Sequence, residues 1–247
     1  MTEYKGIKGG KVQNYDTDPG TPYVGQVWYN QNLGDLRVRS TTLTNAWATG
    51  GNLNTAKVFP GGAGTQTAAL AFGAFNPSTS ATTELYDGSS WTEVNDLNTA
   101  RGRMGSNGTS TSALGYGGAN PSITGETESW NGTSWTEVAD LNTARQQLAG
   151  AGADNTSALA FGGLNPPTFY ANTESWNGSS WTEVNDLNTA RRDLGGNGII
   201  TSALAYGGDT PGATAATESW NGTSWFEVNN LNTARRLAGA GTDNTNA

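Results

Sequence analysis

The chain has 247 residues, a formal net charge of −8, no Cys and no His. The lack of Cys excludes disulfides, thiolate metal sites and a cysteine nucleophile, and the lack of His removes the commonest general base and metal ligand. Negative charge disfavours binding to nucleic acids and to anionic membranes, and no apolar run is long enough to insert into a bilayer. Only 34% of residues are hydrophobic, but nine Trp, eight Tyr and six Phe can build a core. We therefore expect a soluble, folded protein.

The N-terminal segment, residues 1–24, contains several glycines and two prolines and has no apolar stretch typical of a signal peptide. Such a segment does not pack by itself, and we expect it to form an arm that becomes ordered on a partner. Residues 25–247 are then expected to form the folded domain.

A repeat dominates the rest of the sequence. The segment Trp-x-x-x-x-x-Leu-Asn-Thr-Ala occurs five times, at intervals of 44, 44, 46 and 44 residues, starting at Trp47, Trp91, Trp135, Trp181 and Trp225. A Gly-Gly pair and a Glu-x-Trp-Asn-Gly segment recur in the same register in the later copies. Repeats of this length are typical of folds in which each copy is one supersecondary unit packed on its neighbours.

Each repeat is expected to form four short strands, because it lacks a helical apolar period and is interrupted by Gly, Ser, Thr and Asn about every ten residues. Alternation in the second strand places Leu114 and Tyr116 on one face and smaller residues on the other. Asn131-Gly132 predicts a type I′ turn, in which both central residues have positive φ. In the second full repeat the predicted strands are Met104–Asn107, Ser112–Gly117, Glu126–Trp130 and Ser134–Val138.

Four strands in about 44 residues, with Gly-Gly after the second strand, are typical of a β-propeller blade. The sequence resembles the kelch-repeat family over residues 47–240, although its period is shorter than is usual for that family. The resemblance implies an all-β propeller of kelch-like, four-stranded blades. It is carried by Gly117-Gly118 after the second strand, Trp130 at the position of the kelch Tyr-Asp, Trp135 opening the fourth strand, Arg145, and the Tyr-Asp pair itself at Tyr86-Asp87.

We predict five blades, the fifth assembled from both ends of the chain. Gln26–Tyr29, Leu36–Arg39 and Ala46–Ala48 would supply its second, third and fourth strands, and Leu237–Gly241 its first. Closing the ring by pairing N- and C-terminal strands removes both exposed sheet edges. The alternative is an open ring completed by a neighbouring chain.

Charged residues also recur once per repeat. Because a substrate clamp would not be copied in every blade, we expect these residues to pair from blade to blade. The two series are Arg101, Arg145, Arg191 and Arg235, and Glu84, Glu128, Glu174 and Glu218.

We predict that the protein is not an enzyme. The copper site of the kelch-bearing galactose oxidase needs His ligands and a Cys–Tyr crosslink, and sialidase-like sites need Arg and carboxylate residues that are not copies of a repeat. Asp16-Thr17-Asp18 lacks the further ligands of a calcium loop. We therefore predict no catalytic residues, no metal and no cofactor.

The loops after the second strand and the residues just after the recurrent Arg differ between repeats, whereas the turns at the opposite end hardly vary. In an up-and-down blade these variable segments lie on one face, where we predict a binding surface with Phe169 and Tyr170 as its main anchors. Random drift of loops and packing of these aromatics against a neighbouring blade are the alternatives. The predicted binding residues are Phe75, Arg103, Gln146, Gln147, Phe169, Tyr170, Arg192, Asp193 and Asp209.

The hairpin sequence in residues 25–38 and the Trp-Asn-Gly-Thr-Ser-Trp repeats resemble structural proteins of marine bacteriophages. This resemblance implies a virion protein, either associated with the tail or fibre or decorating the capsid. Other virion proteins would bind the N-terminal arm, and a host-surface glycan or protein would bind the propeller face. The alternative is a free multivalent lectin with one sugar site per blade, and self-association is left open.

Overall fold

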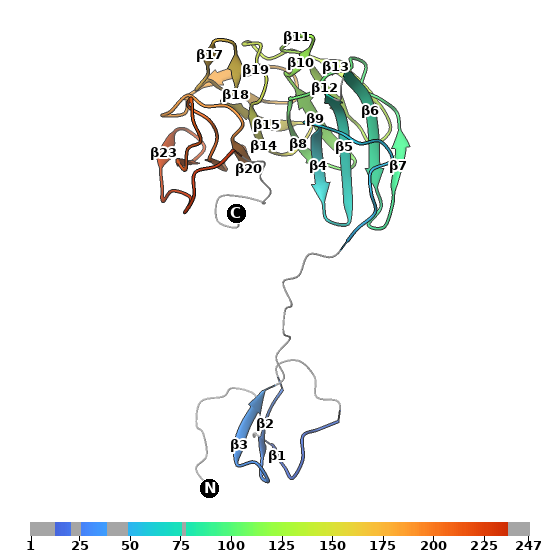
Figure 1. Ribbon diagram of the computed structural model, residues 1–247, viewed down its shortest axis with the longest axis vertical. Coiled ribbons are helices and arrows are strands. Elements are labelled where there is room, and N and C mark those ends of the chain that lie inside the picture. Colours follow the sequence, from blue (N-terminus) through green and yellow to red (C-terminus); the bar gives the residue numbers. More distant parts are fainter. Residues whose placement is uncertain (1–12, 21–25, 39–48, 76–77, 237–247) are drawn as a thin grey trace. The chain divides into compact units, whose positions relative to one another are not determined.

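The computed structural model describes residues 13–20, 26–38, 49–75 and 78–236 (Figure 1). These residues form strands and turns and no helix, which confirms the predicted all-β class. Nowhere in the described residues is there a helix long and apolar enough to span a membrane. The chain divides into two compact units, unit 1 (Met1–Thr49) and unit 2 (Gly50–Ala247).

Unit 1 contains one three-stranded sheet with the order β1-β2-β3. β1 runs parallel to β2, and β2 forms an antiparallel hairpin with β3. Asp18 accepts hydrogen bonds from Asn30 Nδ2 at 2.8 Å and from Trp28 Nε1 at 3.0 Å, which lower the pKa of Asp18. The strands are β1 (Gln13–Tyr15), β2 (Val27–Asn30) and β3 (Asp35–Val38).

This sheet corrects the predicted fifth blade. A blade would have Leu237–Gly241 beside the strand at Gln26–Tyr29, but β1 and β3 already occupy both edges of β2. Asp18, in the expected arm, accepts hydrogen bonds from two residues of β2. The hairpin of β2 and β3 therefore lies in the same unit as the expected arm. The strands predicted at Ala46–Ala48 and Leu237–Gly241 lie outside the described residues.

The described residues of unit 2 form four antiparallel sheets of four strands, which we call sheets I to IV. The strands of sheet II lie within two residues of their predicted bounds. Sheet I consists of β4 (Gly61–Thr65), β5 (Ala68–Phe75), β6 (Thr79–Tyr86) and β7 (Trp91–Val94). Sheet II consists of β8 (Gly105–Thr109), β9 (Ser112–Tyr116), β12 (Thr127–Trp130) and β13 (Trp135–Val138).

Sheets III and IV repeat this pattern, and two short hairpins extend the loops after the second strands of sheets II and III. Sheet III consists of β14 (Ala149–Asp154), β15 (Ser157–Phe161), β18 (Thr173–Trp176) and β19 (Trp181–Val184). Sheet IV consists of β20 (Gly195–Ile199), β21 (Ser202–Tyr206), β22 (Thr217–Trp220) and β23 (Trp225–Glu227). The hairpins are β10 (Ala119–Asn120) with β11 (Ser122–Ile123), and β16 (Leu164–Asn165) with β17 (Thr168–Phe169).

The turn between the third and fourth strands differs from the predicted type I′ turn. Gly132 has φ 93°, but Asn131 is not among the residues with positive φ. Instead, Asn131 Oδ1 accepts hydrogen bonds from the main-chain N–H groups of Thr133 and Ser134, each at 2.9 Å. The Asn side chain closes a four-residue loop, so only the glycine needs a left-handed conformation.

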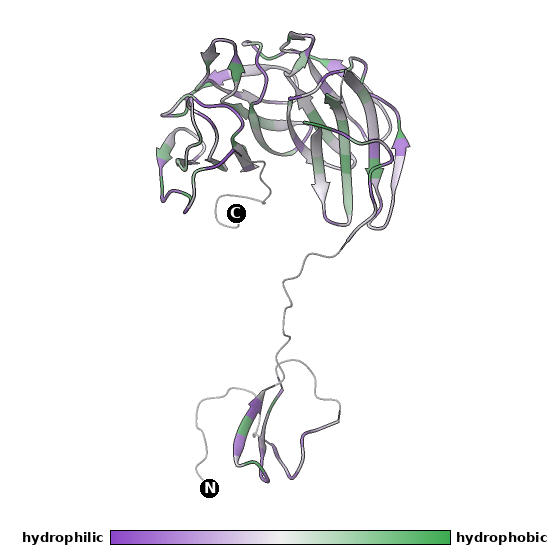
Figure 2. Ribbon diagram, in the orientation of Figure 1, coloured by the Kyte–Doolittle hydropathy of each residue, from purple (hydrophilic) through white to green (hydrophobic). Residues whose placement is uncertain are grey.

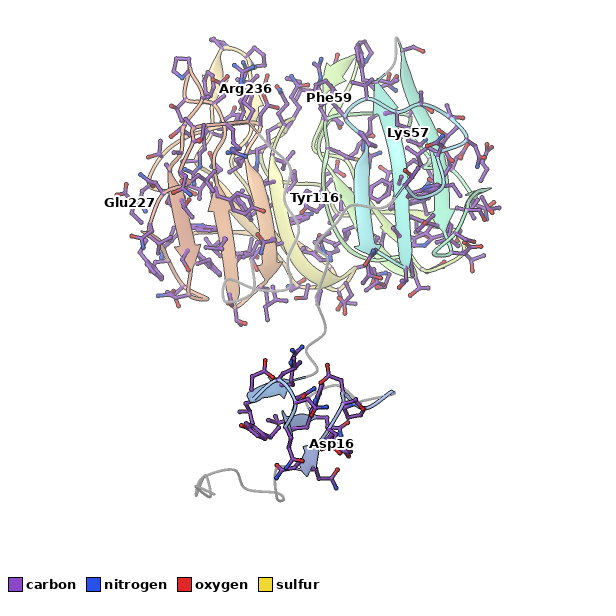
Figure 3. The ribbon with its side chains drawn as sticks, turned by 60° about the horizontal axis from the view of Figure 1, so that its bottom comes forward. Asp16, Lys57, Phe59, Tyr116, Glu227 and Arg236 are labelled. Atoms are coloured by element: carbon purple, nitrogen blue, oxygen red, sulfur yellow. The ribbon has the colours of Figure 1, made fainter. Side chains whose placement is uncertain are left out.

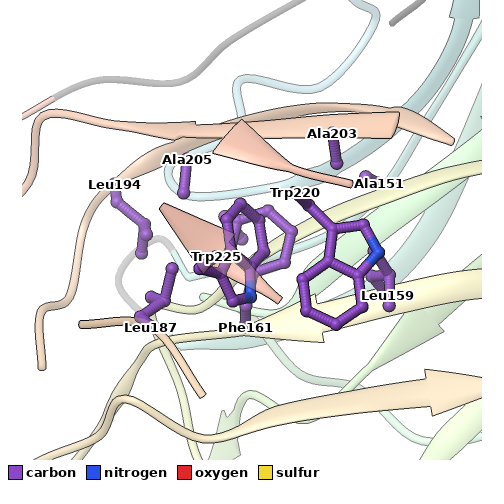
Figure 4. Packing of buried hydrophobic residues seen from close by; sticks show 10 residues of the cluster. Ala151, Leu159, Phe161, Leu187, Leu194, Ala203, Ala205, Trp220 and Trp225 are labelled. Atoms are coloured by element: carbon purple, nitrogen blue, oxygen red, sulfur yellow. The ribbon is translucent and has the colours of Figure 1, made fainter. Parts of the chain in front are cut away.

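The apolar core lies between successive sheets. Its aromatic side chains form pairs across these joints, with ring centroids 4.6 Å apart for Phe72–Trp135, 5.0 Å for Tyr116–Trp181 and 4.8 Å for Phe161–Trp225. Figure 4 shows the cluster between sheets III and IV. The alternation predicted for β9 is confirmed, because Ala113 packs into the cluster toward sheet I and Leu114 and Tyr116 into the cluster toward sheet III.

The predicted pairing of charged residues between repeats is also confirmed. Buried ion pairs join Arg101 to Glu128 and Arg145 to Glu174, each at 2.5 Å, and Arg191 to Glu218 at 3.1 Å. Each Arg follows one sheet, and its Glu lies on the third strand of the next. In sheet I, Lys57 takes the place of the Arg and its Nζ lies 3.8 Å from Glu84 Oε1. Arg235, the last of the series, is exposed.

The first strands of the four sheets, β4, β8, β14 and β20, lie side by side and line a cavity of about 570 Å³. Aromatic rings lie against some of the glycines in these strands: a Cβ on Gly61 or Gly105 would overlap the ring of Phe72 or Tyr116. Figure 2 shows the hydrophobic residues concentrated in the strands, whereas most connections are hydrophilic. The described residues do not form a closed ring.

Candidate functional site

The variable loops of unit 2 meet at one end, which we call the loop face. It consists of the loops after the second strands, residues 117–126, 162–172 and 207–216, and the connections between sheets, residues 58–60, 101–104, 145–148 and 191–194. Isolated β-bridges join the two kinds of loop at Gly102–Ala119, Gln146–Leu164 and Arg192–Asp209. Phe59 and Arg236 lie at the same end of unit 2 (Figure 3).

The backbone of the connections between sheets is repeated on this face. Phe59, Arg103, Gln147 and Asp193 adopt left-handed φ values of 53°, 60°, 56° and 50°. Main-chain hydrogen bonds link them in a row, from Arg103 N to Phe59 O at 3.0 Å, from Gln147 N to Arg103 O at 2.7 Å and from Asp193 N to Gln147 O at 3.0 Å. One unfavourable backbone conformation thus presents four different side chains.

A cavity of about 430 Å³ opens beside Arg103, and we call it the Arg103 pocket. The Arg103 guanidinium lies over two phenyl rings, 4.9 Å from the centroid of Phe75 and 5.2 Å from that of Phe59. Gln146 is only 6% exposed, and its Oε1 has no hydrogen-bond partner among the described residues. The pocket is lined by Phe75, Thr79, Gly102, Arg103, Ala119, Pro121, Ile123, Gln146 and Pro166.

A second group of side chains surrounds the buried carboxylate of Asp209. Arg192 Nη2 lies 2.9 Å and Arg236 Nη2 3.0 Å from Asp209 Oδ2. Burial raises the pKa of Asp209, but the N–H of Gly212 and the two guanidinium groups together outweigh burial and lower this pKa. Asp193 Oδ2 lies 3.8 Å from Arg192 Nε, so two carboxylates balance the two guanidinium groups of this cluster.

The structure places the predicted residues in two groups. Three of them line the Arg103 pocket, and most of the others belong to the Asp209 cluster: the Arg192 guanidinium lies 5.3 Å from the centroid of Phe169, and Gln147 Nε2 donates to Asp193 Oδ1 at 2.7 Å. Tyr170 is half-buried, and its main chain hydrogen-bonds to Gly163 and Arg191. The residues in the pocket are Phe75, Arg103 and Gln146.

The predicted anchors Phe169 and Tyr170 are both half-buried, and neither lines the pocket. The Phe169 ring contacts the Arg192 guanidinium, a contact of the kind that the packing alternative expects. Sequence reasoning missed Phe59, although it lies 44 residues before Arg103 and thus at the same position of the repeat. It also missed Ile123 and Pro166, whose contribution depends on how the loops fold.

The loop face combines apolar, amide and charged side chains. No group of three or more Asp, Glu, His or Cys side chains in the described part of the chain is arranged to hold a metal ion. The Arg103 pocket combines apolar walls with two polar side chains, a combination common in ligand sites. No protein-family model matches this chain, and no curated protein matches it either.

Proposed function

We propose that the protein is a non-enzymatic structural protein of a bacteriophage virion, associated with the tail or fibre or decorating the capsid. Its loop face binds a host-surface glycan or protein. Its N-terminal unit attaches it to other virion proteins, so the protein is located in the virion.

The observation that supports a binding role is the contrast between the two ends of unit 2. At the loop face, one repeated backbone carries Phe59, Arg103, Gln147 and Asp193. At the other end, Asn131, Asn177 and Asn221 make the same turn with the same hydrogen bonds in three sheets. Diversity of side chains on a fixed scaffold is what a binding surface requires, because it changes recognition without changing the fold.

We also propose that sheets I to IV are successive blades of a kelch-like propeller. Their first strands line one cavity, as blades do around a central axis. At the end of sheet IV, Asn232 and Arg235 are exposed, whereas their equivalents Asn98 and Arg101 bond to Glu128 of the next sheet. A further sheet with a glutamate on its third strand would fit there, which supports continuation of the ring.

The virion assignment is supported by the sequence resemblance to phage structural proteins and by the separate N-terminal sheet, which is a compact unit of its own. A lectin with one identical site in every blade is less well supported. The residues at the position of Arg103 are Gln147 and Asp193 in the following repeats, and those at the position of Phe75 are Ala119, Leu164 and Asp209.

Two measurements test the proposal. Immunogold labelling of phage particles with antibodies against this protein should decorate virions, and unlabelled virions would contradict the location. The purified protein should compete with these particles for adsorption to host cells, and Phe75→Ala should weaken that competition. Thr133→Ala, at the opposite end of unit 2, is the matched control. Undiminished competition by the Phe75 variant would contradict the role of the loop face.

A further inference from the structure

Arg103 differs in its partners from the other arginines of unit 2 that are buried or half-buried. Arg101, Arg145 and Arg191 pair with glutamates, and Arg192 pairs with Asp209. Arg103 is half-buried yet forms no ion pair with a described carboxylate. Its Nε is buried with no described hydrogen-bond partner, as are the Nε atoms of the three arginines that pair with glutamates. A guanidinium keeps its charge at all ordinary pH values, and such a charge is costly to bury without a partner.

The backbone and the neighbouring rings hold this charge in place. The main chain of Arg103 is fixed on both sides, because its N–H donates to Phe59 O and its C=O accepts from Gln147 N. The rings of Phe59 and Phe75 contribute cation–π attraction to the guanidinium. These two rings are themselves 50% and 38% exposed, so apolar surface remains uncovered beside an unpaired cation.

The surroundings indicate what would pair with Arg103. The pocket volume of about 430 Å³ lies within the usual range of sites for small ligands. Pro121, Ile123 and Pro166 make its wall largely apolar, and Gln146 adds an amide with an unsatisfied oxygen. A carboxylate matches the planar fork of a guanidinium and carries one charge. A phosphate monoester carries roughly 1.5 to 2 negative charges at neutral pH, more than a single arginine neutralises in a chain of net charge −8.

We propose that the Arg103 pocket binds a small ligand that bears a carboxylate and hydroxyl groups, of the class of acidic sugars, and that Arg103 receives the carboxylate. This inference rests on the proposed binding role of the loop face and names the class of ligand. It assigns a single site to unit 2, because no other described repeat has Arg at this position.

Calorimetric titration of the full chain with D-glucuronate and D-galacturonate tests the proposal, with D-glucose and glucose 6-phosphate as comparison probes. At least one uronate should bind more tightly than both comparison probes, and added salt should weaken its binding. Arg103→Gln should lower the affinity at least tenfold, because a charge-assisted pair is lost. Arg103→Lys should lose less affinity than Arg103→Gln, because lysine keeps the positive charge although it lacks the planar fork of the guanidinium.

The variants are chosen to preserve the fold. Gln already occupies the equivalent left-handed position at Gln147, so Arg103→Gln is compatible with the local backbone. Arg235→Gln removes an exposed guanidinium that does not line the pocket and should leave uronate affinity unchanged.

Four outcomes would overturn the proposal: no binding of either uronate at millimolar concentration, equal binding of glucose, tighter binding of glucose 6-phosphate, or wild-type affinity in Arg103→Gln. Labelled virions and competition for host cells would still support the proposed function in each of these cases. Unlabelled virions with Arg103-dependent uronate binding would instead contradict the function and support the pocket.

Discussion

Arg145 Nη1 donates a hydrogen bond to Glu174 Oε1 across 2.5 Å, and the two residues belong to successive sheets. Arg145 follows sheet II, whereas Glu174 lies on β18 of sheet III, and both side chains are buried. The carboxylate also accepts hydrogen bonds from the N–H groups of Asn142 and Thr143. A buried, hydrogen-bonded ion pair therefore lies beside the apolar cluster between the two sheets. Charge as well as packing specifies how one sheet is placed against the next.

Arg145→Ala should lower the free energy of unfolding by about 3–5 kcal/mol, because it leaves the carboxylate of Glu174 buried without its cation. Urea denaturation followed by tryptophan fluorescence measures this change. Arg235→Ala is the matched control, since Arg235 has the same place in the repeat but is exposed, and its effect should stay within about 0.5 kcal/mol. Equal losses in the two variants would contradict the assigned role of the buried pair.

Lys57→Arg should stabilise the protein by roughly 1 kcal/mol. Lys57 occupies the place that Arg has in the later repeats, and its Nζ lies 3.8 Å from Glu84 Oε1. An arginine there can reach Glu84 and the carbonyl of Ala71, as Arg145 reaches Glu174 and the carbonyl of Ala160. Thermal unfolding of the variant and the wild type side by side tests this, and a lower melting temperature for Lys57→Arg would contradict it.

The stabilising effect of Lys57→Arg should depend on pH. Burial lowers the pKa of Lys57 below its ordinary value of 10.5, and the attraction of Glu84 opposes this effect only in part. In the pH range between the folded and unfolded pKa values, the unfolded chain binds more protons, so this lysine makes stability rise with pH. The guanidinium that the substitution introduces stays protonated throughout this range. The stability advantage of Lys57→Arg should therefore shrink as pH approaches 10.5, and an advantage that grows over this range would contradict the assignment.

Gly150 and Tyr116 provide a test of packing between sheets II and III. A Cβ on Gly150 would overlap the hydroxyl of Tyr116, which donates to the carbonyl of Leu159 at 3.3 Å. The equivalent residues one repeat earlier are Ser106 and Phe72, a residue with a Cβ and a ring without a hydroxyl. Gly150→Ser should cost roughly 1–3 kcal/mol by overpacking, and Tyr116→Phe about 1 kcal/mol by loss of the hydrogen bond.

The double variant should lose less stability than the sum of the single variants, because Tyr116→Phe removes the atom that the new side chain would meet. A double-mutant cycle of urea unfolding measures this coupling. Additive losses would show that Gly150 is needed for another reason.

The sequence predicts the sheets well because their determinants are local and repeated. The 44-residue spacing and the Gly-Gly pairs locate the strands, and the recurring Arg and Glu predict ion pairs between repeats, of which Arg145–Glu174 is one. The strands β2 and β3 were predicted from the sequence, but the strand that pairs with the other edge of β2 was not. A strand pattern does not specify which neighbour occupies an edge. β1 occupies that edge, helped by hydrogen bonds to Asp18 that no repeat signals.

The candidate site was predicted only in part. Divergence between repeats points to the loops that hold Arg103 and Gln146, and both residues line a cavity. Phe169 lies outside the pocket, and Arg192 stacks over its ring, a contact made by a different loop. Contacts between loops of different repeats depend on backbone geometry that composition and spacing do not specify.

The left-handed backbone at position 147 leads to a last prediction. Gln147 has φ 56°, a conformation that glycine adopts freely and that β-branched residues strongly disfavour. Gln147→Gly should therefore change the free energy of unfolding by no more than about 0.5 kcal/mol, whereas Gln147→Val should lower it by roughly 2 kcal/mol. The neighbouring Gln146 is not among the residues with positive φ and is buried, so Gln146→Gly should be more destabilising than Gln147→Gly. Urea denaturation of the three variants measures this order, and a glycine at position 147 that destabilises as much as valine would contradict the role assigned to the backbone of the loop face.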